Sequence, residues 1–149
     1  MTLSRWYATL SGRWDDRGSG AGALIIFSML FLVLAAFVVD GGMAISQRER
    51  AADIAEQAAR FAAQDIDRAA LYEGSGGAPI NFRNCEARVR RYAREAKMAL
   101  PDIAASGCVS ANAQRVQVEI RLTYRPVLGL YHSGPVTVRG RAVAESVTG

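Results

Sequence analysis

The hydrophobic and polar positions divide this chain into three parts, and the first is a long uncharged segment. Residues 18–39 contain no charged side chain, and residues 22–39 are apolar apart from Ser28. A helix of about 20 such residues is about 30 Å long, which matches the hydrocarbon thickness of a bilayer. The pattern therefore predicts a transmembrane helix over residues 18–40, which Asp40 ends. A cleaved signal peptide, cut near residues 42–44, is the alternative.

A helical period replaces the uncharged pattern after Asp40. Small residues recur at heptad spacing on one face, and charged residues occupy the other face. This pattern predicts an Ala-rich helical stalk over residues 41–72. Two partners for the small-residue face remain open, the globular part of the same chain and a neighbouring subunit. The candidate helix-packing residues are Ala52, Ala55, Ala59, Ala62 and Ile66.

The remaining residues, 73–149, predict a small α+β domain. Asn84 can cap a second helix, whose apolar face includes Cys85 and Val89 and which Pro101 ends. Apolar and polar residues alternate strictly over residues 115–125 and less cleanly over 136–147, which predicts two antiparallel strands. A third, short strand near residues 108–110 is an option. Because two strands alone are marginal in water, the helices must cover their apolar face.

The arginines on either side of the uncharged segment bear on its orientation. Three precede it, and two follow it within the distance that the positive-inside rule counts. With a short arm facing a larger carboxyl-terminal domain, this difference predicts that residues 1–17 are a cytoplasmic arm. Residues 73–149 are then extracytoplasmic, in a single-pass protein of the inner (cytoplasmic) membrane. The five arginines are Arg5, Arg13 and Arg17 before the segment, and Arg48 and Arg50 after it.

The two cysteines, Cys85 and Cys108, depend on the compartment for their interpretation. In an oxidising compartment they predict one disulfide, whereas in the cytosol they would be two buried thiols. Since the membrane segment predicts export of the residues that follow it, we expect the disulfide. The bridge would close a loop of about 24 residues and stabilise the domain by about 3 kcal/mol in the chain-entropy model.

Charge and residue usage argue against several classes of function. The formal net charge is +4, but the basic residues are dispersed among acidic ones, so we expect no nucleic-acid partner. The single histidine, His132, lies in a connection without a nucleophile motif, and we expect no catalytic residues and no enzyme. Metal-ligand spacing is absent. The glycines at 18–22 follow no strand and precede no amphipathic helix, so we expect no phosphate loop, cofactor or small-molecule substrate.

Residues 16–66 read DRGSGAGALIIFSMLFLVLAAFVVDGGMAISQRERAADIAEQAARFAAQDI. This first half of the chain resembles the TadE/TadG-type proteins of bacterial tight-adherence (Tad/Flp) pilus systems. Within it, the typical features are an Arg-Gly-small start, an apolar span ending in Val-Asp-x-Gly, a basic stretch and an Ala-rich helix. The later segments VQVEIRLTYRPVLGL and VTVRGRAVAESVTG are similar to small actinobacterial members, so the resemblance covers most of the chain.

This resemblance implies a pilin-like layout and a membrane-anchored pseudopilin or minor pilin-like component of a pilus-assembly or secretion apparatus. Its implied partners are membrane lipid and other pilus-assembly or pilin subunits, contacted by helix packing. In members that a prepilin peptidase cuts, the cut follows a glycine, and a glutamate lies five residues beyond. The candidate processing residues here are Gly18 and Ser19, but Ala23 stands where that glutamate would be. This departure favours members that keep their anchor. An anchored extracytoplasmic binding module unrelated to pili is the alternative function.

Overall fold

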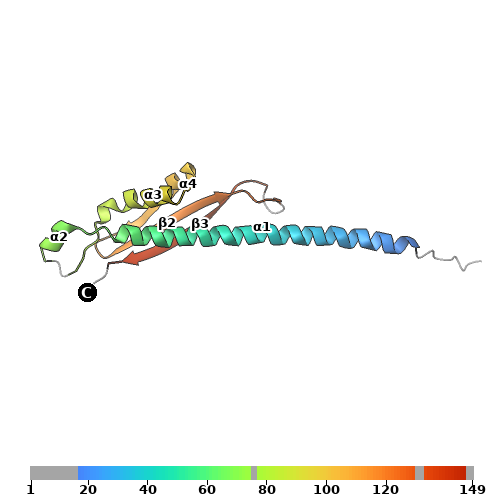
Figure 1. Cartoon of the computed structure of the whole chain (residues 1–149), viewed down its shortest axis with the longest axis horizontal. Coiled ribbons are helices and arrows are strands. Elements are labelled where there is room, and N and C mark those ends of the chain that lie inside the picture. The colour runs from blue at the N-terminus through green and yellow to red at the C-terminus, as the bar shows by residue number, and fades with distance from the viewer. Residues whose placement is uncertain (1–16, 75–76, 130–132, 147–149) are drawn as a thin grey trace, which may run out of the picture. The chain divides into compact units, whose positions relative to one another are not determined.

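The computed structural model describes residues 17–74, 77–129 and 133–146 (Figure 1). Its helices are α1 (Arg17–Ala63), α2 (Arg68–Tyr72), the 3-10 helix η1 (Phe82–Asn84), α3 (Cys85–Glu95) and α4 (Leu100–Ala105). Its strands are β1 (Gly107–Ala111), β2 (Arg115–Tyr124) and β3 (Val136–Glu145). The predicted α+β fold, with a long amino-terminal helix, further helices and a small antiparallel sheet, is confirmed. The cytoplasmic arm predicted over residues 1–17 falls almost wholly outside the described residues.

The chain divides into two compact units, Met1–Phe37 and Val38–Gly149. The described part of the first unit is the apolar portion of α1. In the described residues, this one helix is long and apolar enough to cross a membrane, with a mean hydropathy of 2.8 over its most apolar window and none of that window buried. The hydroxyl of Ser28 donates to the carbonyl oxygen of Leu24 at 2.8 Å, so the one polar side chain of this stretch is satisfied within the helix.

The second unit is built on a sheet with the strand order β1-β2-β3, antiparallel throughout. The strict alternation in β2 has the predicted result, because its apolar residues point to the core. Directly opposite residues of β2 and β3 share a face, so Gly140 lies on the core face beside Ile120. The buried residues of β2 on that face are Val116, Val118, Ile120 and Leu122.

Helices α1 and α3 supply the other side of this core. In Figure 1 the green portion of α1 runs along β2 and β3. Its buried residues are mostly alanines, and they join one cluster with the buried residues of α3 and the strands. From α1 these are Ala51, Ile54, Ala55, Ala58, Ala59 and Ala62, and from α3 they are Cys85, Val89 and Ala93. Helices therefore cover one face of the sheet, as the alternation of apolar and polar residues in β2 requires.

Two helix ends differ from the sequence prediction. The helix expected through residue 72 stops at Ala63, and α2 begins separately after Asp67, whose carboxylate accepts hydrogen bonds from the N–H groups of Ala69 and Ala70 at 3.1 and 3.3 Å. Such a side chain favours a helix start over a helix interior. Ile66 therefore lies outside any helix and forms an isolated antiparallel bridge with Ile80.

The prediction that Pro101 ends the second helix is wrong. Helix α3 stops earlier, at Glu95, where Lys97 adopts the left-handed conformation with φ of 55°. The N–H of Lys97 then donates to the carbonyl of Arg94 at 3.0 Å, and the N–H of Met98 donates to that of Ala93 at 3.2 Å. This pair of bonds is the Schellman motif. Pro101 lies in the first turn of α4 instead, where its missing N–H costs nothing.

β1 is too short to pair with the whole of β2. Side chains of α4 and of the residue that follows it accept hydrogen bonds from the backbone of β2 beyond the end of that pairing. The N–H of Arg121 donates to the hydroxyl of Ser106 at 2.9 Å, and the N–H of Thr123 donates to a carboxylate oxygen of Asp102 at 3.1 Å. Asp102 and Ser106 are both buried. These two residues, at the start and end of α4, thus take the place of further strand residues in the ladder.

Candidate functional site

The backbone of α1 lies close to the sheet at Gly140. A methyl group added to Gly140 would overlap the backbone of Ala51 and Ala52. Gly140 is followed on the same face of β3 by Ala142 and Ala144, which pack against the core. Small residues on both elements therefore let the backbone of the helix approach the backbone of the strand. We call this contact the small-residue interface.

The structure places the candidate helix-packing residues in three different environments. Ala55, Ala59 and Ala62 are fully buried in the small-residue interface, within their own chain. Ala52 is exposed and lines an open groove with residues of α1 and of the start of β3. Ile66 is 43% exposed and lines a second open groove near the end of α1. The three buried alanines pack inside the protein's own core, so a partner helix could reach only the other two positions.

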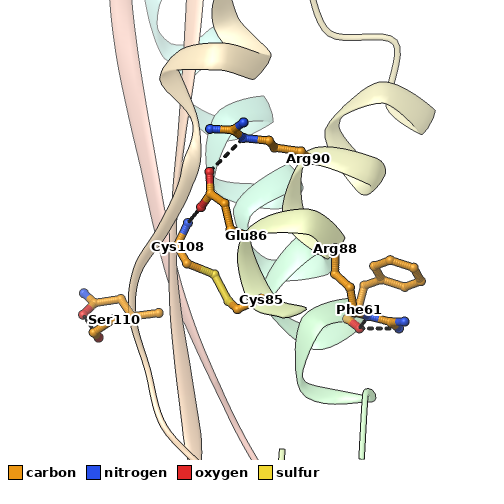
Figure 2. Close-up of a disulfide and its surroundings, with 8 residues drawn as sticks. Phe61, Cys85, Glu86, Arg88, Arg90, Cys108 and Ser110 are labelled. Atoms are coloured by element: carbon orange, nitrogen blue, oxygen red, sulfur yellow. Dashed lines mark hydrogen bonds and ion pairs between the residues drawn. A yellow bond between two sulfur atoms is a disulfide. The ribbon is translucent and has the colours of Figure 1, made fainter. Parts of the chain in front are cut away.

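The disulfide joins the start of α3 to β1 (Figure 2). Cys85 and Cys108 are bridged with their Cα atoms 6.2 Å apart, which confirms the predicted disulfide. Next to it, the carboxylate of Glu86 accepts a hydrogen bond from the backbone N–H of Cys108 at 2.8 Å and pairs with Arg90 at 2.8 Å. The covalent bridge and the Glu86 contact together attach α3 to the outer edge of β1.

A second contact attaches α3 to the end of α1. The guanidinium of Arg88 donates two hydrogen bonds to the carbonyl oxygen of Phe61, at 2.8 and 3.0 Å, and stacks over the Phe61 ring at 4.0 Å (Figure 2). The carbonyl of Phe61 is one of the last in α1, where no further helical N–H is available to it. One turn along α3, the Tyr92 hydroxyl lies 2.5 Å from the side-chain oxygen of Gln57. Polar side chains of α3 therefore fix the last two turns of α1.

The uncovered face of the sheet carries a buried carboxylate. Glu119 of β2 has a side chain only 8% exposed and bonds Arg121 at 2.8 Å and Arg141 at 2.6 Å. The hydrogen bonds from Arg121 and Arg141 lower the pKa of Glu119 below its ordinary value, against the opposing effect of burial. Arg141 lies directly opposite Glu119 on β3, so this pair ties the two strands together on the face away from α1.

The connection from β2 to β3 is bonded to the beginning of the second unit. The backbone N–H of Leu128 donates to a carboxylate oxygen of Asp40 at 3.1 Å. Asp40 directly follows the uncharged segment, and the two residues are 88 positions apart in the chain. The connection therefore lies beside the residue at which the apolar part of α1 ends.

Several of these residues were not singled out from the sequence. Glu119 occupies an outward position of an alternating strand, where solvent exposure is the usual expectation. Asp102 follows Pro101, and Pro followed by an acidic residue is a helix-start signal that could have predicted α4. No local pattern distinguishes Glu86, Arg88 or Asp40 from other charged residues, because each bonds to a partner at least 22 positions away.

No described group of residues has the composition of a metal site. Three or more His, Cys, Asp or Glu side chains do not cluster anywhere in the described ranges. His132 lies outside the described residues. The candidate processing residues, Gly18 and Ser19, belong to the first turn of α1. The described residues instead offer packing surfaces, a connection that is hydrogen-bonded to Asp40, and a domain held by a disulfide.

One comparison with known proteins found a match. Residues 18–65 match the model of the family described as putative Flp pilus-assembly TadE/G-like. No curated protein and no solved structure matched the chain. The matched residues include the uncharged segment and all of the α1 residues in the core cluster.

Proposed function

We propose, from the match of residues 18–65 to the TadE/G-like pilus-assembly family, that this chain is a membrane-anchored, pseudopilin-like structural component of a Flp-type pilus-assembly or secretion apparatus. The observation that carries the proposal is the coincidence of that match with one helix. The first part of this helix contains a long uncharged stretch with no buried residue in its most apolar portion, and its second part packs into a folded domain. The family is one of assembly components, which supports a role in packing and positioning rather than in catalysis.

Membrane anchoring is supported by the surface of the first part of α1. Its large apolar side chains are about half to three-quarters exposed, and in water such a surface would be costly. A lipid bilayer removes that cost, and the length of the segment fits the hydrocarbon core. The disulfide Cys85–Cys108 supports an extracytoplasmic domain, because such bonds persist in oxidising compartments. The amino-terminal arm is then cytoplasmic.

Contacts with other pilus components would use the surfaces that the fold leaves available. Because Ala55, Ala59 and Ala62 are buried against the protein's own sheet, they cannot also pack on a neighbour. The exposed groove that includes Ala52 and the apolar part of α1 remain available for helix packing. We therefore propose that subunit contacts involve these two surfaces, and that the buried alanines keep the domain on its anchor helix.

The anchoring part of this proposal can be tested in the source cell by complementation. A strain lacking the gene should lose Flp-type pili and adherence, and the full chain should restore both. Leu30→Arg places a charge at the centre of the apolar segment, which costs about 3 kcal/mol in membrane insertion, and should not restore them. Ser28→Ala keeps the segment apolar and is the matched control. Normal piliation and adherence in the deletion strain would overturn the proposal.

Processing can be tested on the same membrane protein by mass spectrometry of its amino terminus. We propose that the anchor is retained, because Ala23 replaces the glutamate of processed members. A mature chain beginning at Met1 or Thr2 is the expected result. A chain beginning at Ser19 would instead show prepilin-type cleavage after Gly18, and one beginning at Ile45 would show signal-peptide removal.

A further inference from the structure

The connection between β2 and β3 contains a short exposed turn, residues 125–129, which we call the apolar turn. Its apolar side chains Val127 and Leu128 are 66% and 51% exposed. Gly129, which follows them, has φ of 63°, a left-handed conformation that glycine adopts without strain. Two neighbouring exposed apolar residues on a surface are ordinary by themselves. Their position is what calls for an explanation.

That position is set by Asp40. The Leu128 N–H donates to the Asp40 carboxylate at 3.1 Å, and Asp40 directly follows the last residue of the uncharged segment. If residues 20–39 span a bilayer, Asp40 lies at the membrane surface. The hydrogen bond then holds Val127 and Leu128 at that same level. Arg125, at the base of the turn, is also exposed and carries a positive charge.

We propose that the apolar turn docks on the surface of an anionic phospholipid bilayer. Val127 and Leu128 enter the boundary between headgroups and acyl chains, and Arg125 lies at the level of the lipid phosphates. The inference rests on the membrane anchoring in the proposed function. It adds a second lipid contact, made by the folded domain itself, 88 positions along the chain from the end of the membrane segment.

The test uses the full chain in vesicles of phosphatidylethanolamine and phosphatidylglycerol. Because both native cysteines are in the disulfide, one added cysteine can carry an environment-sensitive fluorophore. Val127→Cys reports on the turn, Leu30→Cys on the membrane segment, and Ser110→Cys on an exposed strand position near the opposite end of β2. Phospholipids with a quencher near the headgroup or deep in the acyl chain then measure the depth of each label.

We expect quenching at position 127 to be several-fold stronger than at position 110, and stronger from the shallow quencher than from the deep one. Position 30 should respond most to the deep quencher. If position 30 is quenched and position 127 is no more quenched than position 110, the lipid contact of the turn is wrong and the anchoring stands. If position 30 is not quenched, the anchoring is wrong, and the inference falls with it.

Variants of Asp40 test the hydrogen bond that places the turn. Asp40→Ala removes the acceptor of the Leu128 N–H, so quenching at position 127 should fall toward that at position 110. Asp40→Asn keeps an acceptor oxygen and should preserve the quenching. Equal quenching at position 127 in both variants would overturn the role given to this bond.

Discussion

The backbone of Ala51 in α1 occupies the space that any side chain at position 140 of β3 would need. Gly140 is thus a point of close approach between the helix and the sheet, and the buried alanines of α1 belong to the same core cluster. Because the neighbouring atoms belong to the backbone, no change of rotamer can make room for a larger residue. The small-residue interface depends on this one glycine.

Gly140→Ala should therefore lower the free energy of unfolding of the full chain by about 1–3 kcal/mol, the usual range for overpacking a core. Thermal unfolding in detergent micelles, followed by near-ultraviolet circular dichroism, measures the change. Gly134→Ala is the matched control, since a methyl group there has nothing within 4 Å. Equal melting temperatures for the two variants would contradict the close contact at Gly140.

Glu119 should make the stability of the domain depend on pH. Its pKa in the folded chain is lowered from the ordinary 4.5, first by the hydrogen bond from Arg121 and then by that from Arg141. The stabilisation is therefore complete above the unfolded pKa and is lost as the pH falls through the lower, folded pKa. Glu119→Gln should reduce the free energy of unfolding at pH 7 by about 1–3 kcal/mol.

Denaturant titrations of the wild type and of Glu119→Gln at several pH values measure this effect. The difference between them should shrink as the pH falls from 4.5 through the lower folded pKa, because the unfolded wild-type chain takes up the proton at a higher pH than the folded chain does. Glu145→Gln, at an exposed position of β3, is the control, and its free energy of unfolding at pH 7 should stay close to that of the wild type. A difference that stays constant from pH 7 to strongly acid conditions would argue against the ion pairs.

Asp102 should matter as a hydrogen-bond acceptor. Asp102→Ala leaves the Thr123 N–H without the buried carboxylate that it bonds, in a part-buried hydrogen bond, and should reduce the free energy of unfolding by about 1–3 kcal/mol. Asp102→Asn retains an acceptor oxygen and should reduce it by less. Amide hydrogen exchange at Thr123 gives a local readout, and fast exchange in Asp102→Ala alone is the expected pattern. Similar exchange in both variants would show that the bond contributes little.

The strands could be predicted from the sequence more accurately than the helix ends. In β2 the apolar residues alternate with polar ones, and only one register puts Val118 and Ile120 in the core. Alanine carries much less information, because it is common on both buried and exposed helix faces. Heptad spacing accordingly included the exposed Ala52 and omitted the buried Ala51. Ala51 is buried because the sheet lies against it at Gly140, and a local pattern does not contain that fact.

The end of α3 depended on a conformation that the sequence does not signal. Glycine or asparagine is the usual left-handed residue after a helix, yet here it is Lys97. The sequence prediction therefore continued the helix to the next recognisable breaker, Pro101. The same reasoning applies to Glu86, Arg88 and Asp40, whose partners are chosen by the tertiary fold.

Lys97→Gly should stabilise the chain. A residue with a side chain pays about 1 kcal/mol for the left-handed conformation, and glycine does not, although its greater freedom in the unfolded chain offsets part of the gain. We expect an increase of about 0.5–1 kcal/mol in the free energy of unfolding, measured by denaturant titration. Arg94→Gly, inside α3, is the opposite control and should destabilise by a similar amount. A loss of stability in Lys97→Gly would contradict the Schellman end of α3.

The small-residue interface also determines which mutations this protein can accept. Alanine has only one smaller replacement, and Gly140 has none, so nearly every substitution along this contact adds atoms where backbones already meet. The one substitution that removes atoms, Ala→Gly in α1, instead weakens the helix by up to about 1 kcal/mol. Random mutation can therefore damage this interface in many ways and improve it in very few. A screen of substitutions should find its least tolerant positions at the smallest side chains of the domain rather than at its largest.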